Sequence, residues 1–148
     1  MSTPHRVIAA FALLVTACSA RAMGPPEIVV DRSTCSHCGM FVSEPAYAAA
    51  YQADGNDPRV FDDIGCMLDA VRSETASPIT IWLQDAAGSG WMAAEEATFV
   101  ASPRLRTPMS GGVIAYADAS AAATAATTHG GQVMRSWPEL IKWHGEVK

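Results

Sequence analysis

The sequence has no run of Lys or Arg and shows none of the residue patterns of common catalytic sites. Its 15 acidic residues outnumber 10 basic ones and give a formal net charge of -5, so no basic surface is expected to hold a phosphate backbone and nucleic acid is not an expected partner. No Ser/His/Asp arrangement, phosphate-cradling loop or nucleotide fingerprint is present, so nothing indicates an enzyme. A length of 148 residues excludes a large multidomain protein.

The N-terminus has the pattern of an export signal, predicted over residues 1–17. A short polar start precedes an apolar stretch from Val7 to Val15, which falls short of the roughly 20 residues that span a bilayer. The following Thr-Ala-Cys resembles a bacterial lipobox, so Cys18 is predicted to carry a lipid. Ordinary cleavage after Ala22 is the alternative. In either case the mature protein works outside the cytoplasm.

Lipidation of Cys18 would anchor the protein to a membrane on the periplasmic side of the cell envelope, through a linker over residues 18–26. Ser19 favours the outer membrane. Three cysteines then remain in the folded part, and an odd number in an oxidising compartment cannot form a closed set of internal disulfides. At least one thiol must be free, paired between chains, or bound to something.

The mature chain, residues 27–148, is predicted to be an α+β domain of two small ββαβ-like units, over about 27–86 and 91–136. They form one compact domain or two tightly packed subdomains. Turn residues and apolar periodicity predict the elements of both units. The first unit has a β-prone stretch at 27–31, strands over 47–53, 59–62 and 79–83, and a helix over 64–73. The second has strands over 96–101, 113–117 and 132–135, a helix ending near 128, a long loop over 102–112, and a final helix at 138–143.

Asp63 and Asp118 precede the two predicted helices at matching positions and are expected to cap them. This correspondence indicates an internal duplication. Asp62 and Asp63 together could also suggest acid–base chemistry, but the helix cap already explains Asp63.

Cys35-x-x-Cys38 places two sulfurs on one turn, where both can reach one metal ion, and Gly39 allows the sharp backbone path. This pair alone leaves several interpretations open. A zinc site would need further ligands, with Cys66, His37, His129 and His144 as candidates. A redox-active pair or a disulfide staple is also compatible with the spacing, although the redox motif usually opens a helix. Haem attachment is excluded because Gly39 stands where that motif requires histidine.

Methionines beside the cysteines favour copper(I) over zinc. Met40 follows Cys38 closely, Met67 follows Cys66, and Met109 lies in the long loop. Thioether sulfur is a poor zinc ligand but a good copper(I) ligand. Met67 is more simply explained as core, since its helix is amphipathic, and Met92 and Met134 are expected to be packing residues. His37 is either a ligand or a surface residue.

Cys66 is expected in the first turn of its helix, where the helix dipole lowers a thiol pKa. A thiolate at Cys66 near neutral pH is therefore predicted. His129 is expected at the end of the second helix, where a cation interacts favourably with the dipole.

Three segments together resemble the family of NosL, the nitrous oxide reductase accessory protein. They are Cys35-Ser36-His37-Cys38-Gly39-Met40-Phe41-Val42, Phe61-Asp62-Asp63-Ile64-Gly65-Cys66-Met67-Leu68, and Met109-Ser110-Gly111. The resemblance extends from about residue 28 to 136. It implies an exported copper(I) chaperone lipoprotein that supplies nitrous oxide reductase together with a membrane transporter-type maturation complex.

Carried over by position, the resemblance implies that Cys38 is the principal copper thiolate and that Met109 is the methionine of the family's Met-Gly loop. Here Ser110 separates Met109 from Gly111, which departs from that pattern. Cys35, Cys66 and Met40 are further candidate ligands, and whether the two cysteines ligate copper or pair with each other stays open. The alternatives from other classes are a thiol-disulfide oxidoreductase and a zinc-stapled binding module.

Overall fold

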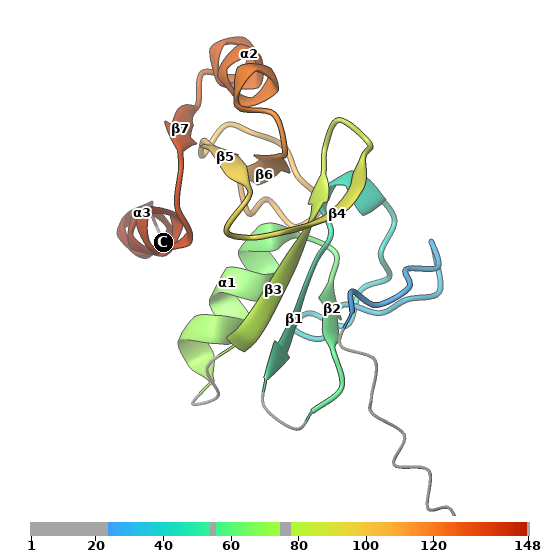
Figure 1. Cartoon of the computed structure of the whole chain (residues 1–148). Helices are drawn as coiled ribbons and strands as arrows, with labels where there is room; N and C mark the ends of the chain where they lie inside the picture. Colours follow the sequence, from blue (N-terminus) through green and yellow to red (C-terminus); the bar gives the residue numbers. More distant parts are fainter. Residues whose placement is uncertain (1–23, 54–55, 75–77, 148) are drawn as a thin grey trace, which may run out of the picture.

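The computed structural model describes residues 24–53, 56–74 and 78–147 (Figure 1). The predicted signal and Cys18 lie outside these residues. A short 3-10 helix, η1 (Pro45–Tyr47), precedes the regular elements. These are β1 (Ala49–Ala53), β2 (Arg59–Phe61), α1 (Ile64–Ser73), β3 (Pro78–Asp85), β4 (Gly90–Ala93), β5 (Thr98–Ala101), β6 (Val113–Tyr116), α2 (Ala119–His129), β7 (Gln132–Met134) and α3 (Trp137–Val147).

The strands form two antiparallel sheets, one in each half of the chain. Their orders are β2-β1-β3-β4 and β6-β5-β7. In both sheets the first strand of the half lies in the middle, its hairpin partner lies on one side, and the strand after the helix lies on the other. The predicted α+β class with two ββαβ-like units is therefore confirmed, and β4 is an addition to the first unit.

Helix α1 begins and ends where the sequence predicts. The Asp63 carboxylate caps it by accepting a hydrogen bond from the Gly65 N–H at 2.6 Å. Its apolar side chains at helical spacing, including Ile64, Met67 and Leu68, are buried against the first sheet. Each such side chain stabilises the fold by about 1.5–3 kcal/mol. Met67 is thus a core residue, as its position in the amphipathic pattern suggested.

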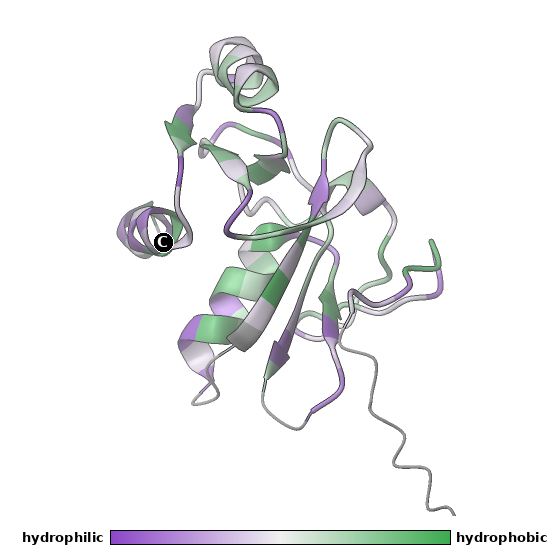
Figure 2. Cartoon of the chain, in the orientation of Figure 1, coloured by the Kyte–Doolittle hydropathy of each residue, from purple (hydrophilic) through white to green (hydrophobic). Residues whose placement is uncertain are grey.

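One hydrophobic core joins the two halves. In the second sheet, Phe99 and Ala101 of β5 face this shared core, whereas Val100 faces α2, which covers the opposite side. The same alternation runs through β6. Figure 2 shows hydrophobic residues along α1, where it lies beside the first sheet. Cys35 and Cys66 belong to this core, so packing fixes the positions of both cysteines.

The β-prone stretch at 27–31 is not a strand, and that prediction is wrong. The N–H groups of Arg32 and Ser33 both donate to the Val29 carbonyl, at 3.1 and 2.8 Å, and turn the chain there. Val29 and Val30 stay exposed, so their β-propensity finds no neighbouring strand. The structure also shows β4, which was not predicted, and a longer final helix. No helix in the described ranges has the length and apolar character needed to cross a membrane.

Candidate metal centre

Three thiols and one carboxylate converge at one end of the first sheet. The ligand atoms of Cys35, Cys38, Asp62 and Cys66 all lie within 4.8 Å of one another. Two of these residues come from the turn before β1, one directly follows β2, and one lies in the first turn of α1. The structure therefore brings together all three predicted cysteines and adds an aspartate. Ligand atoms this close can all coordinate one ion after small side-chain adjustments.

The cysteine turn is closed by its own backbone. The Cys35 N–H donates to the Met40 carbonyl at 2.8 Å, and the Gly39 N–H donates to the Cys35 carbonyl at 3.0 Å. Gly39 has a φ of 77°, in the left-handed region that glycine adopts without a steric penalty. This is the sharp path that the sequence predicted at Gly39. It turns both cysteine side chains toward the same end of the sheet.

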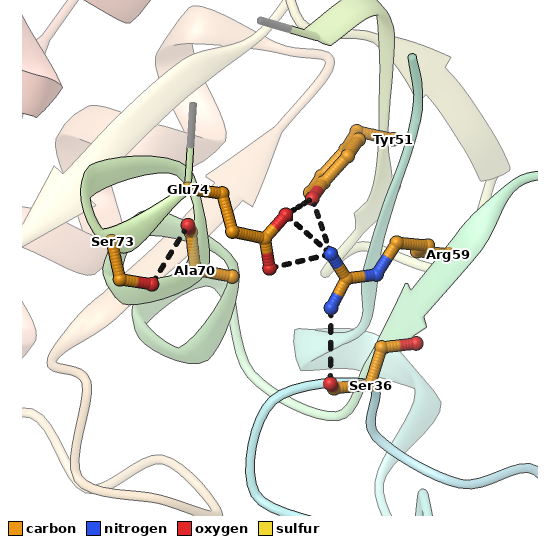
Figure 3. Close-up of polar contacts among 6 residues, drawn as sticks. All are labelled: Ser36, Tyr51, Arg59, Ala70, Ser73 and Glu74. Carbon is orange, nitrogen blue, oxygen red and sulfur yellow. Dashed lines mark hydrogen bonds and ion pairs between the residues drawn. The ribbon is translucent and has the colours of Figure 1, made fainter. Parts of the chain in front are cut away.

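The side chain of Arg59 in β2 forms a hydrogen bond to the backbone of this turn (Figure 3). Its Nη2 donates to the Ser36 carbonyl at 3.1 Å, and its Nη1 forms an ion pair with Glu74 at the end of α1. The Tyr51 hydroxyl donates to Glu74 Oε2 at 2.6 Å and accepts from Arg59 Nη1 at 2.8 Å. One guanidinium therefore connects the cysteine turn to both β1 and α1. Nothing in the sequence pattern pointed to this network.

A hydrogen bond between Cys35 and Cys66 shifts the pKa values of the two thiols in opposite directions. A hydrogen bond from the Cys66 thiol lowers the pKa of Cys35 to about 3, against the opposing effect of burial. The same hydrogen bond, reinforced by burial, raises the pKa of Cys66. The lowered pKa in this pair is that of Cys35, and the lowered pKa expected at Cys66 from the helix dipole is not seen. The helix dipole favours an anion near Cys66 by only about 0.3–1 kcal/mol, whereas the hydrogen bond with Cys35 is the largest influence on the pKa of Cys66 and raises it.

Cys38 is the accessible thiol of the cluster. It is partly exposed, whereas Cys35 and Cys66 are buried, and its Sγ donates to Asp62 Oδ1 at 3.8 Å. Burial raises the pKa of the Cys38 thiol, with hydrogen bonding to and repulsion from Cys35 adding to the effect. Burial, followed by interaction with Cys35, raises the pKa of Asp62 to about 7. Asp62 was considered earlier only as part of an acidic pair, so its place among the thiols is a finding of the structure.

Two of the predicted methionines lie at the surface. The side chains of Met40 and Met109 are 58% and 39% exposed. Met40 directly follows the Cys38-Gly39 turn, and Met109 lies in the 102–112 loop. His37 is exposed on the turn between the two cysteines. Thioethers at the surface can be displaced by ligands of another protein, unlike thioethers in a core.

The remaining candidates have structural roles. Met92 and Met134 are buried, as expected of packing residues. His129 is the last residue of α2, before Gly130 in the left-handed conformation. His144, once a candidate zinc ligand, is buried with its Nε2 2.8 Å from Asp69 Oδ1.

The methionine loop is attached to the start of α1. Asp63 Oδ2 accepts hydrogen bonds from the backbone N–H of Met109 at 3.0 Å, from the N–H of Gly111 at 3.3 Å, and from the Thr107 hydroxyl. The loop and the helix are so close that a Cβ on Gly65 would lie 2.5 Å from the Gly111 Cα. The backbone of Met109 is thus held next to the helical turn that carries Cys66.

The donor set suits a soft metal ion. Thiolates bind copper(I), zinc and iron–sulfur clusters, and nearby thioethers shift the preference toward copper(I). The pKa values of Cys38 and Cys66 are raised, so metal binding at these two thiols releases protons. The arrangement can therefore hold one ion with a small number of soft ligands, one of which is accessible.

The family of the chain follows from its similarity to known proteins. No curated protein matches the chain. The chain is similar to the crystal structure of the copper chaperone NosL from Shewanella denitrificans, with a TM-score of 0.66 and 16% sequence identity. That similarity covers 78% of this chain and 94% of the other. The family model of NosL matches residues 26–138, which is most of the chain, and the protein therefore belongs to the NosL family.

Proposed function

We infer that the protein is a copper(I) chaperone, not an enzyme, and that it binds one ion at the cluster of Cys35, Cys38 and Cys66. The observation that carries this proposal is the convergence of three thiols within 4.8 Å beside Asp62. Family membership and the similarity to a copper chaperone of known structure support it. Met109 and Met40 are proposed as thioether ligands that complete or exchange within the site.

Partial exposure of the site suits transfer. Cys38 is the accessible thiol, and the nearby Met40 and Phe41 are 58% and 59% exposed. An incoming thiol, thioether or imidazole can approach at this edge and replace the ligands one at a time, so the ion is never released to water. A buried, four-coordinate structural site would not allow this exchange.

The proposed recipient is the maturation system of nitrous oxide reductase, including its membrane transporter-type complex. The NosL family resemblance of the sequence supports this partner. The lipobox pattern at Cys18 supports a lipid anchor on the periplasmic side of the envelope. A tether would raise the effective concentration of the carrier beside a membrane-bound partner.

The geometry argues against a thiol-disulfide oxidoreductase. A reactive redox cysteine combines a low pKa with exposure. Here the two properties are separated, because Cys35 has the lowered pKa but is 2% exposed. The accessible Cys38 has a raised pKa. Neither thiol is therefore well suited to attack an external disulfide.

A zinc-stapled module stays the second candidate because Asp62 supplies a fourth ligand. Three sulfurs and one oxygen form a closed set that zinc accepts. The experiment that separates the two functions is an anaerobic titration of the reduced protein with copper(I), against a bathocuproine-type chelator. Zinc is titrated in parallel against a zinc chelator. The chaperone proposal expects one tightly bound copper(I) and weak zinc.

Tight zinc binding without a preference for copper(I) would overturn the chaperone proposal. Variants then locate the site: Cys38→Ser should weaken copper(I) binding more than about 100-fold, beyond the loss typical of a residue that only hydrogen-bonds a metal ligand. Met109→Leu should weaken it less. Met92→Leu is the matched control, since Met92 is a buried packing residue in β4, and should leave affinity unchanged.

A further inference from the structure

The Asp63 carboxylate is buried and uses both of its oxygens for different purposes. Oδ1 accepts from the Gly65 N–H at 2.6 Å and caps α1. Oδ2 accepts from two N–H groups and a hydroxyl of the methionine loop, donated by Met109, Gly111 and Thr107. Capping alone needs only the first oxygen. The second oxygen serves a segment 44 to 48 residues further along the chain.

The duplicated half of the fold shows what capping alone looks like. Asp118 occupies the position equivalent to Asp63 and accepts from the Ser120 N–H, also at 2.6 Å. Its side chain is exposed at the protein surface. The buried position and the loop contacts of Asp63 are therefore not required by helix formation.

Backbone packing also shows, independently of the hydrogen bonds, that the methionine loop is docked on α1. Gly65 and Gly111 approach so closely that a Cβ on either residue would meet the backbone of the other below 3.0 Å. The loop therefore rests directly on the first turn of α1, one residue from Cys66. Its contact with Asp63 is part of a docked geometry.

We propose that Asp63 is the positioning residue of the metal centre, fixing the Met109 loop to the helix that carries Cys66. This inference rests on the proposed copper(I) function. Asp63 does not bind the ion. Its Oδ2 sets where the Met109 backbone lies, next to the helical turn that carries Cys66. Groups that orient metal ligands in this way typically affect metal affinity by roughly 10–100-fold.

The test is a double-mutant cycle with Asp63→Asn and Met109→Leu, measured by copper(I) competition titration of the reduced full chain. Asparagine retains a carbonyl oxygen that can cap α1, but it places an NH₂ donor against the loop's own donors. Asp63→Asn should weaken copper(I) binding about tenfold or more in the parent. In the Met109→Leu background it should cause no further loss, because the ligand that it positions is gone.

A control variant and a second test variant separate positioning from a general loss of structure. Asp118→Asn changes the equivalent cap and should leave copper(I) affinity unaltered. Thr107→Val removes one donor to Asp63 with little change of shape, and should weaken binding in the parent but not in the Met109→Leu background. With ¹³C-methyl methionine, the Met109 methyl resonance should shift on addition of copper(I) in the parent and shift less in Asp63→Asn.

The outcomes are distinct. Equal losses from Asp63→Asn in both backgrounds would overturn the inference, since Asp63 would then act on the thiols or the fold. No loss from Asp63→Asn, or no effect of Met109→Leu, would also overturn it, while leaving copper(I) binding by the thiols intact. If the parent itself failed to bind copper(I) tightly, the proposed function would fail instead.

Discussion

The side chain of Arg59 holds the backbone of Ser36, with Nη2 donating to the Ser36 carbonyl at 3.1 Å. Ser36 lies between the two cysteines of the turn, and its own N–H donates to the Val60 carbonyl at 2.8 Å. The turn is therefore held at both the backbone N–H and the backbone carbonyl of Ser36. Its position depends on strand β2 and not on the cysteines alone.

Arg59→Lys is expected to weaken copper(I) binding roughly tenfold, at the lower end of the range for groups around a metal site. Lysine keeps the positive charge but lacks the planar fork that reaches Ser36 and Glu74 together. Competition titration against a chelator measures the change. Arg72→Lys, at an exposed position in the last turn of α1, is the matched control. Equal affinities for the parent and Arg59→Lys would show that the hydrogen bond from Arg59 to Ser36 does not contribute to copper(I) binding.

The Arg59–Glu74 pair should make stability depend on pH in the acid range. A hydrogen bond from Arg59, then one from Tyr51, lowers the pKa of Glu74 below its usual value of 4.5. A lowered folded-state pKa gives stability that is present above 4.5 and is lost as pH falls through the folded pKa. Because the pair is about one-third exposed, we expect only about 0.5 kcal/mol.

Urea unfolding of the parent and Glu74→Gln at pH 7 and pH 3.5 measures this effect. The difference in unfolding free energy between the two proteins should be larger at pH 7 and should shrink at pH 3.5. A difference that grows on acidification would contradict the assignment.

Copper(I) affinity is expected to rise with pH. The pKa values of Cys38 and Cys66 are raised, so protons compete with the ion at both thiols, and lowering the proton concentration favours binding. Each proton released contributes on the order of tenfold in apparent affinity per pH unit. Titrations between roughly pH 6 and pH 8, where thiol protons compete with the metal, measure the slope. A flat profile would mean that Cys35 alone supplies the thiolate.

His144 is expected to stabilise the fold without taking part in metal binding. It is fully buried, and its Nε2 lies 2.8 Å from Asp69 Oδ1, which joins α3 to α1. His144→Ala should lower the free energy of unfolding by about 2 kcal/mol, through the lost hydrogen bond and packing. Copper(I) stoichiometry should stay the same.

Chemical denaturation measures this loss, with Lys142→Ala as the control on the same helix. Lys142 is exposed and lies 3.9 Å from Glu146, so its removal should change stability by no more than about 0.5 kcal/mol. A change in copper(I) stoichiometry for His144→Ala would contradict this prediction and indicate that His144 takes part in metal binding.

Local signals predicted the fold well where they were strong. The Asp63 cap and the apolar spacing gave both ends of α1, and Asp118 gave the start of α2. The stretch at 27–31 failed because β-branched residues form a strand only beside a partner. Strand β4 was missed because its four residues begin with a glycine and have little alternation.

The candidate site was predictable in its residue types but not in its connections. Cysteine spacing and the family resemblance identified the three thiols, which the structure brings together. Three features depend on contacts between segments that are distant in the sequence. They are the place of Asp62 among the thiols, the hydrogen bond from Arg59 to Ser36, and the hydrogen bonds that Asp63 accepts from the methionine loop. Asp63 was already explained by its position before a predicted helix. The sequence therefore offered no reason to expect that it also binds a loop more than 40 residues away.

The separation of the site along the chain has a consequence for the order of folding. All three thiols lie between residues 35 and 66, whereas the loop held by Asp63 lies more than 40 residues further on. Short-range contacts form before long-range ones, because closing a long loop costs more entropy. The sulfur cluster is therefore closed by a shorter segment of chain than the methionine loop, and the cluster is expected to form before that loop docks.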